Sequence, residues 1–258
     1  MKRLLASLLA LVLCLTSFVA AGEGTDGVTG ITGTYETQGR QLMGLFSGLF
    51  GKKKQAQPYY YSEADLDAFE KMVTGSIGKF DTVFHEIVSP DIHVDIVIIP
   101  PTPEKDYYTL LTMGMGAYPM KVPAEYKNRN RAELAIRLPK DWDISSEDEK
   151  WSWPIWMLKT LARLPINENS WLGRGHDIDF GEPFSEETEL CAILLDFFDE
   201  NLAPLTLENG DQVMIYNVIP IYREEMDYKV AHDTEALTSK MSNETLHGPL
   251  DVHRDKTV

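Results

Sequence analysis

The chain has 258 residues, enough for one globular body with a substantial core, and carries 24 basic against 40 acidic residues. Its net charge of −16 repels phosphate backbones, so nucleic acid is excluded as an expected partner, and a basic protein or peptide is favoured. Charge of this kind also serves simply to keep a protein soluble, and both interpretations stay open.

The N-terminus predicts an export signal over residues 1–21. A Lys-Arg pair precedes an apolar stretch from Leu4 to Ala20, and small residues suit cleavage between Ala21 and Gly22. The apolar stretch is slightly short for a spanning helix, so we expect cleavage and no stable membrane insertion afterwards. An uncleaved membrane anchor is the alternative.

Cleavage after Ala21 would leave 22 basic and 40 acidic residues, a net charge of −18, on a protein that is secreted or held in the cell envelope. Cys191 would then be the only cysteine, which excludes an intramolecular disulfide. Its apolar neighbours favour a buried structural thiol over a nucleophile. Translation from Met43 would instead remove the signal and predict a cytoplasmic protein.

Three regions are expected after the signal. Residues 22–57 are rich in Gly and Thr and lack a sustained period, which is typical of a flexible linker. Residues 58–241 are expected to form the globular domain, and residues 242–258 a polar, loose tail.

The first half of the domain predicts one helix and three strands. The helix begins at Ser62, which can cap it, and ends near Gly75, with Leu66, Phe69, Met72 and Val73 on one face. Strands are expected over residues 82–88 and 92–99, joined as a hairpin, and over 107–113, before a flexible Gly114–Gly116 segment.

The second half predicts a strand over residues 132–138 with one buried face, because four apolar residues alternate with Glu133, Ala135 and Arg137. A helix is expected to start at Ser152 with Pro154, followed by strands over 190–198 and 213–222. A last helix over residues 224–241 would turn Met226, Val230 and Leu237 inward. The order predicts a mixed α/β (α+β) fold with one central, mostly antiparallel or mixed sheet covered by helices.

Polar residues around the predicted hairpin form a candidate site. His93 and Asp95 share a strand face and can meet His85, whereas Glu86 falls on the other face. Because the spacing matches no zinc pattern, we favour a hydrogen-bonded cluster, with a metal-dependent hydrolase using His85, His93 and Asp95 as the alternative. We expect no metal and no cofactor.

No catalytic residues are expected elsewhere. Asp177 and Asp179 would share a face of a strand, but such pairs arise by chance among 40 acids. Neither a nucleophile elbow nor a phosphate-binding loop is present. Trp171, Arg174 and His176 crowd one Gly-containing loop, which either simply turns the chain or forms a contact surface, since Trp and Arg dominate binding hot spots.

Several stretches, in order, give the chain a resemblance to the Suppressor of fused family in its short, bacterial single-domain form. They are Phe84–Glu86, His93–Asp95, Tyr108–Met115, Arg131–Leu138, Trp153–Pro154, Leu161–Arg163, Asn169–His176 and Tyr222–Met226. The resemblance covers residues 77–241 and implies a compact mixed α/β domain that binds proteins without catalysis. The candidate partner-binding residues are Trp171, Arg174, His176, Glu133 and Arg137.

The resemblance also limits what can be transferred. The animal member restrains Gli-type zinc-finger transcription factors by gripping a peptide between this domain and a second, C-terminal one. No second domain is expected here, so neither that clamp nor the Hedgehog-pathway role is carried over. Some bacterial relatives are thought to be immunity proteins that neutralise secreted toxins, and an acidic surface would suit a basic toxin. The oligomeric state stays open.

Overall fold

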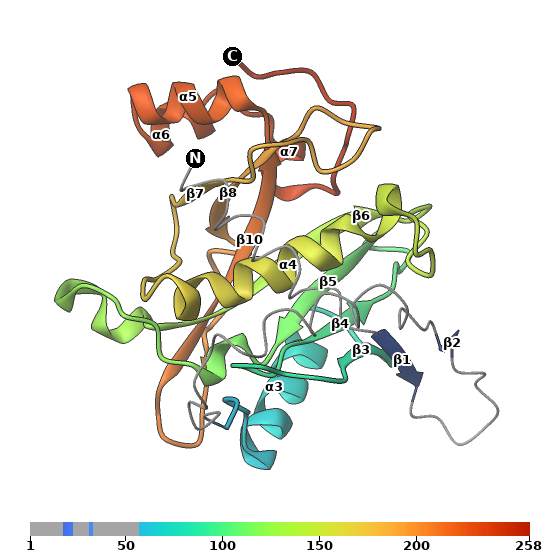
Figure 1. Cartoon of the computed structure of the whole chain (residues 1–258), viewed down its shortest axis with the longest axis vertical. Helices are drawn as coiled ribbons and strands as arrows, with labels where there is room; N and C mark the ends of the chain where they lie inside the picture. The colour runs from blue at the N-terminus through green and yellow to red at the C-terminus, as the bar shows by residue number, and fades with distance from the viewer. Residues whose placement is uncertain (1–17, 23–30, 33–56) are drawn as a thin grey trace, which may run out of the picture.

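The computed structural model describes residues 18–22, 31–32 and 57–258, which Figure 1 shows. Strands β1 (Phe18–Gly22) and β2 (Ile31–Thr32) fall within the predicted signal and linker. The predicted cleavage site, Ala21 and Gly22, lies in β1, whereas Met43 lies outside the described residues. Export, cleavage and the alternative start stay predictions.

One mixed sheet of ten strands runs in the order β2-β1-β3-β4-β5-β6-β10-β8-β7, with β9 paired to β10. Among the strands of the described residues, β6 and β10 form the only parallel pair. The remaining strands are β3 Thr82–Glu86, β4 Asp95–Ile99, β5 Tyr107–Met113, β6 Arg131–Pro139, β7 Asp177–Asp179, β8 Ala192–Phe197, β9 Leu205–Thr206 and β10 Gln212–Ile221. The predicted mixed α/β class with one central sheet is confirmed. The sheet is larger than predicted because its shortest strands contain too few residues to show a periodicity.

Helix α3 (Glu63–Ser76) begins where its cap was predicted. The Ser62 hydroxyl accepts from the Asp65 N–H at 3.2 Å, and the Asp65 carboxylate accepts from the Ser62 N–H at 3.4 Å. Phe69 and Val73 are buried, but Leu66, predicted on the same face, is 39% exposed. The face that packs on the sheet is therefore narrower than the sequence indicates.

Strand β6 lies in the middle of the sheet and is buried on both faces, so the prediction of a single buried face is wrong. Helix α4 (Glu149–Asn167) covers one face, and α3 and the C-terminal helices cover the other (Figure 1). The side chains on both faces of β6 are therefore buried against other parts of the protein.

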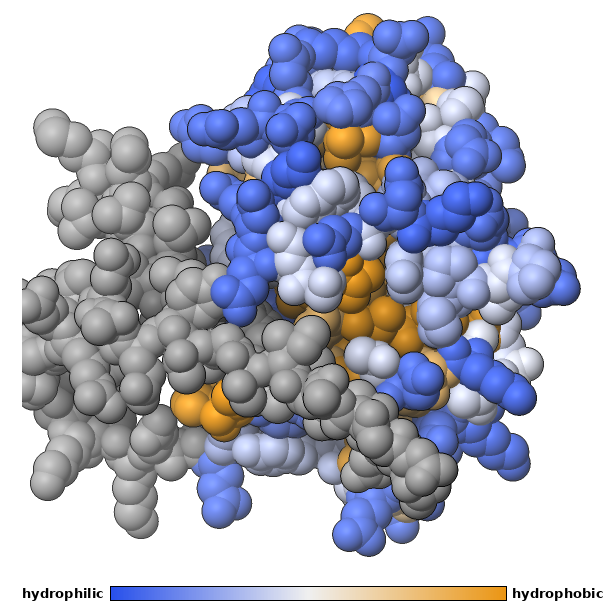
Figure 2. Space-filling view, turned by 90° about the vertical axis from the view of Figure 1, so that its right-hand side faces the viewer, coloured by the Kyte–Doolittle hydropathy of each residue, from blue (hydrophilic) through white to orange (hydrophobic). Residues whose placement is uncertain are grey.

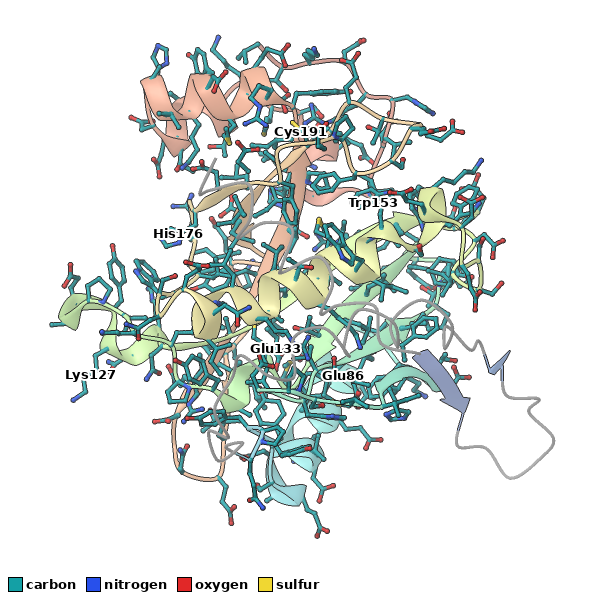
Figure 3. All side chains as sticks on the ribbon, viewed as in Figure 1. Glu86, Lys127, Glu133, Trp153, His176 and Cys191 are labelled. Atoms are coloured by element: carbon teal, nitrogen blue, oxygen red, sulfur yellow. The ribbon has the colours of Figure 1, made fainter. Side chains whose placement is uncertain are left out.

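Helix α4 starts earlier than predicted. Its N-cap is Asp148, whose carboxylate accepts from the Lys150 N–H at 3.1 Å, so Pro154 lies inside the helix and does not mark its start. The other connections near the sheet are two 3₁₀ helices, η1 (Met115–Ala117) and η2 (Ala124–Arg129). Helix η2 projects from the body beside β10 and carries Lys127 at its tip (Figure 3).

The C-terminal region differs most from its prediction. The expected helix over residues 224–241 is two helices, α5 (Arg223–Ala231) and α6 (Thr234–Thr238), because Asp233 caps a new helix by accepting from the Ala236 N–H. Val230, predicted to point inward, lies in the last turn of α5 and is 71% exposed.

The expected loose tail is also wrong. It contains α7 (Asn243–His247), buries Leu250, and returns to the body through Arg254, which pairs with the buried Glu225 at 2.5 Å. No helix among the described residues is long and apolar enough to cross a membrane. The face shown in Figure 2 is largely hydrophilic around a central band of apolar surface.

Candidate functional site

The loop after α4 brings together two of the three residues predicted to form a contact surface. The Trp171 ring lies 4.2 Å from the His176 ring in an edge arrangement, and Tyr126 of η2 stacks on Trp171 at 5.0 Å. Burial lowers the pKa of His176, and the nearby Lys229 lowers it further. Figure 3 shows His176 at the periphery of the molecule, away from the central helix α4.

Arg174, the third residue of this loop, contacts a different set of neighbours. Its guanidinium donates to Asp196 at 2.7 Å and to Glu235 at 3.3 Å, and it lies 5.8 Å from the centre of the Phe197 ring. The two carboxylates hold a partly exposed cation in one orientation. The surface formed by Tyr126, Trp171, Arg174 and His176 is called the Trp171 surface below.

Glu133, a further candidate, lies inside the protein and presents no surface to a partner. Its side chain is 0% exposed, and its carboxylate accepts from the Tyr61 and Thr112 hydroxyls at 2.7 and 2.5 Å and from two backbone N–H groups at 2.9 and 3.0 Å. Those N–H groups belong to Gly114 and Gly116, so the segment predicted to be flexible is fastened to Glu133. Burial raises the pKa of this carboxyl to about 7, although all four donors favour the ionised form.

Arg137, the fifth candidate, is also buried, at 7% exposure. Its guanidinium lies 4.0 Å from the centre of the Phe198 ring and donates to the Phe198 carbonyl at 2.9 Å, while Nε and Nη1 have no hydrogen-bond partner among the described residues. Burial lowers its pKa. The sequence predicts Glu133 and Arg137 on an exposed strand face. Both are buried because packed protein covers both faces of β6.

The polar cluster at the β3–β4 turn forms, but β4 begins only at Asp95, so His93 precedes the strand and does not share its face as predicted. The Asp95 carboxylate contacts His85 Nδ1 at 2.9 Å and His93 Nε2 at 3.1 Å. Burial raises the pKa of Asp95, but hydrogen bonds from His93, the Glu86 N–H and His85 outweigh it and the pKa is lowered. The hydrogen bond to Asp95 likewise raises the pKa of His93. The His93 Nδ1 lies 2.8 Å from the Ser89 hydroxyl.

Glu86 faces the other way, as its alternation with His85 predicted. Its buried carboxylate accepts from Arg163 of α4 at 2.6 Å and lies 3.7 Å from Lys159. No group of three or more His, Cys, Asp or Glu residues in the described part of the chain could hold a metal ion. The residues of the alternative hydrolase site, His85, His93 and Asp95, contact one another through the Asp95 carboxylate.

The remaining polar candidates have structural partners. Asp177 and Asp179 lie on β7 and form ion pairs with Lys229 and Arg223 of α5, which attach that helix to the edge of the sheet. Cys191 is a buried free thiol whose pKa is raised by burial, as expected for a structural cysteine.

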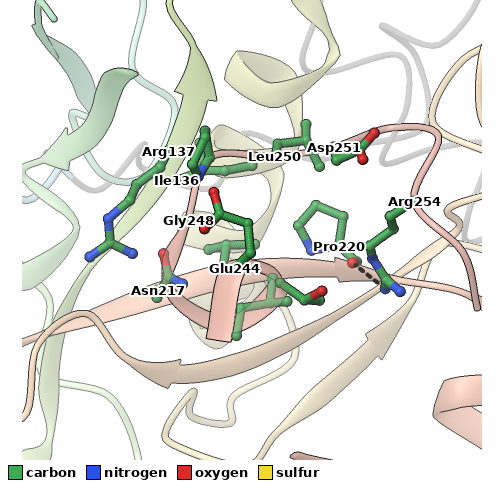
Figure 4. Close-up of a pocket in the computed structure, with 13 residues that line it drawn as sticks. Ile136, Arg137, Asn217, Pro220, Glu244, Gly248, Leu250, Asp251 and Arg254 are labelled. Carbon is green, nitrogen blue, oxygen red and sulfur yellow. Dashed lines mark hydrogen bonds between the residues drawn. The ribbon is translucent and has the colours of Figure 1, made fainter. Parts of the chain in front are cut away.

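Two cavities lie near these residues. The first, of about 80 Å³, lies between β10 and the C-terminal segment, where Arg254 donates to the Pro220 carbonyl; Figure 4 shows the Arg137 guanidinium directed away from Glu244 and Arg254. The second, of about 310 Å³, lies beside the Trp171 surface and is lined by Arg129, Phe197 and the loop after β8. Sequence reasoning missed Tyr126, Arg129 and Phe197, because only the fold brings them to this loop.

Comparisons with known proteins agree on the family. The model of the Suppressor of fused protein (SUFU) family matches residues 90–255, which extends beyond the predicted domain end at Met241 into the packed tail. An uncharacterised protein of Ureaplasma parvum is 23% identical over 207 residues, covering 78% of this chain and 98% of that protein.

Solved structures with the same fold include a putative SUFU homologue of Neisseria gonorrhoeae, with a TM-score of 0.53 and 18% identity over 77% of this chain and 97% of that one. Drosophila Suppressor of Fused gives a TM-score of 0.55 and 13% identity over 80% of this chain and 54% of that one. A structure of the Sufu–Fu complex gives 0.50 and 14%, over 78% and 93%. With more than half of its residues matched by the family model, the chain belongs to the Suppressor of fused family.

Proposed function

We propose that this protein is an exported, non-catalytic binding module that captures a basic protein or peptide through the Trp171 surface. The observation that carries the proposal is the arrangement of Trp171 and Arg174. Both are on one partly exposed loop, and both are held in place by neighbours, Trp171 by Tyr126 and Arg174 by two carboxylates. Trp and Arg side chains fixed before binding lose little conformational entropy when a partner docks.

Family membership supports a binding role. The fold is shared with a protein solved as the Sufu–Fu complex, and Suppressor of fused domains serve as protein-interaction modules in eukaryotes. The titratable residues considered for catalysis are engaged in hydrogen bonds and ion pairs that stabilise the fold, which favours binding over chemistry.

Charge supports a basic partner. With 40 acidic and 24 basic residues, the chain attracts cationic proteins over several ångströms and accelerates their encounter. Sequestration of a basic toxin, as by an immunity protein, is one form that such binding would take outside the cytosol.

Affinity capture tests the proposal. The full chain, tagged at its C-terminus, is incubated with the medium and envelope fractions of its host, beside the double variant Trp171→Ala/Arg174→Ala. A matched double variant, Leu66→Ala/Lys140→Ala, removes an exposed apolar and an exposed basic residue elsewhere. Thermal unfolding of all three proteins establishes that they are folded.

We expect the parent and the matched variant to retain the same basic protein. The Trp171/Arg174 variant should bind that protein at least about tenfold more weakly, which is the effect of losing one hot-spot residue. Equal retention by all three proteins, or no retained protein, would refute binding through this surface. Export is tested separately by the mass of the native N-terminus: Gly22 supports it, and Met43 or Gly44 refutes it.

A further inference from the structure

The cavity of about 310 Å³ beside the Trp171 surface has the size of a ligand pocket and lies where four segments meet. Arg129 comes from η2, Phe197 from the end of β8, Met214 from β10, and Ala203 from the loop after β8. Helix η2 joins the pocket to the Trp171 surface, because the same helix places Tyr126 on Trp171.

The lining of the pocket is apolar. Phe197, Met214, Leu202 and Pro204 are each half-buried, so each offers part of its apolar surface to the opening, and Ile215 is buried below. The Phe197 ring is supported by Tyr216, which stacks on it at 6.0 Å. An aromatic ring supported in this way is a rigid wall against which an aliphatic or aromatic side chain can pack.

The rim of the pocket is charged and unbalanced. Asp199, Glu200 and Arg129 are exposed residues of the lining, and Arg129 lies 5.9 Å from the centre of the Phe197 ring. Among the described residues, neither Glu200 nor Arg129 forms an ion pair, and the Asp199 carboxylate accepts only from Asn201 of its own loop. Among the charged residues that line the pocket, two carboxylates outnumber one cation, so the lining has a net negative charge.

We infer that this pocket receives an apolar side chain of the protein partner, and that Asp199 and Glu200 bind a lysine or arginine next to that side chain. The inference rests on the proposed function and specifies the partner: an extended segment with an aliphatic or aromatic residue beside a basic one. Burial of the apolar side chain supplies affinity, and the carboxylates, exposed at the rim, supply selectivity. The position beside the Trp171 surface lets one segment contact both.

A phage-displayed library of random dodecapeptides tests the inference when selected on the full chain. Two pairs of variants are selected in parallel. Ala203→Trp fills the pocket from its exposed wall, with Ala231→Trp, at an exposed position on α5, as its control. Glu200→Lys reverses the net charge of the lining, with Glu104→Lys, at an exposed position in the loop between β4 and β5, as its control.

We expect peptides selected on the parent to share an apolar residue adjacent to Lys or Arg. Fluorescence anisotropy of the consensus peptide should give at least about tenfold weaker binding to Ala203→Trp, a change of about 1.4 kcal/mol, and unchanged binding to Ala231→Trp. Selection on Glu200→Lys should replace the basic residue by Asp or Glu, whereas Glu104→Lys should select the parent consensus.

Three results would overturn the inference: no enriched peptide, a consensus without an apolar residue, or equal affinity for Ala203→Trp and its control. The double variant Trp171→Ala/Arg174→Ala separates this failure from failure of the proposed function. Peptides that lose affinity for that variant but not for Ala203→Trp would preserve binding through the Trp171 surface and refute the pocket.

Discussion

Replacement of Glu133 by Gln should change how the stability of the protein depends on pH. Glu133 is fully buried on β6, and burial raises its pKa from 4.5 to about 7. A carboxyl whose pKa is higher in the folded than in the unfolded state stabilises the fold fully below the unfolded value. That contribution is lost as the pH rises through the folded value.

The magnitude follows from the two pKa values. The gap between 4.5 and about 7 corresponds to about 3 kcal/mol, which the parent loses between pH 4.5 and pH 8 because Glu133 must ionise inside the protein. Gln is neutral at both pH values and has nearly the same shape. The free energy of unfolding of Glu133→Gln, relative to that of the parent, should therefore rise by about 3 kcal/mol over this interval.

Urea unfolding followed by Trp fluorescence from pH 4.5 to pH 8 measures this difference. Glu104→Gln, at an exposed position, is the control and should follow the parent at every pH. Parallel profiles for the parent and Glu133→Gln would refute the reasoning. They would mean that hydrogen bonds from Tyr61, Thr112 and the two glycines fully compensate the burial of the charge.

Three further predictions concern buried groups. Arg163→Met removes the 2.6 Å partner of the buried Glu86 carboxylate and leaves only Lys159, 3.7 Å away, as a cation beside it. The substitution should cost about 3 kcal/mol in urea unfolding, against little for Lys140→Met. Arg254→Met should cost a similar amount, because it removes the ion-pair partner of Glu225, which is 0% exposed. A variant as stable as the parent would mean that this ion pair between the tail and the domain does not stabilise the fold. Cys191 should react with a thiol reagent only at the rate of unfolding, because it is 6% exposed and burial raises its pKa; fast labelling of the folded protein would contradict this.

Elements with a strong local pattern could be predicted from the sequence. Strand β5 has the predicted bounds, Tyr107–Met113, and α3 begins after Ser62 as its capping box indicates. In both cases the deciding contacts lie within a few residues along the chain. The prediction of a continuous helix over residues 224–241 is wrong because Asp233 caps a new helix within it, as Ser62 caps α3.

The candidate site could likewise be predicted only in part from the sequence. Trp171, Arg174 and His176 lie within six consecutive residues, so their proximity follows from the sequence. The alternation that sets His85 and Asp95 on one face also follows from the sequence. The burial of Glu133 and Arg137 was not predictable, because alternation indicates which side chains share a face but not what covers that face.

The acidic composition, the family motifs, the main strands and the residues of the Trp171 loop are thus determined by the sequence alone, through short-range periodicity and residue chemistry. Only the tertiary structure decided that both faces of β6 are covered, that the tail folds back through Arg254, and that Arg129 and Phe197 form a pocket beside Trp171. The physical reason is that these contacts join residues tens of positions apart, whose approach depends on the packing of the whole sheet and its helices.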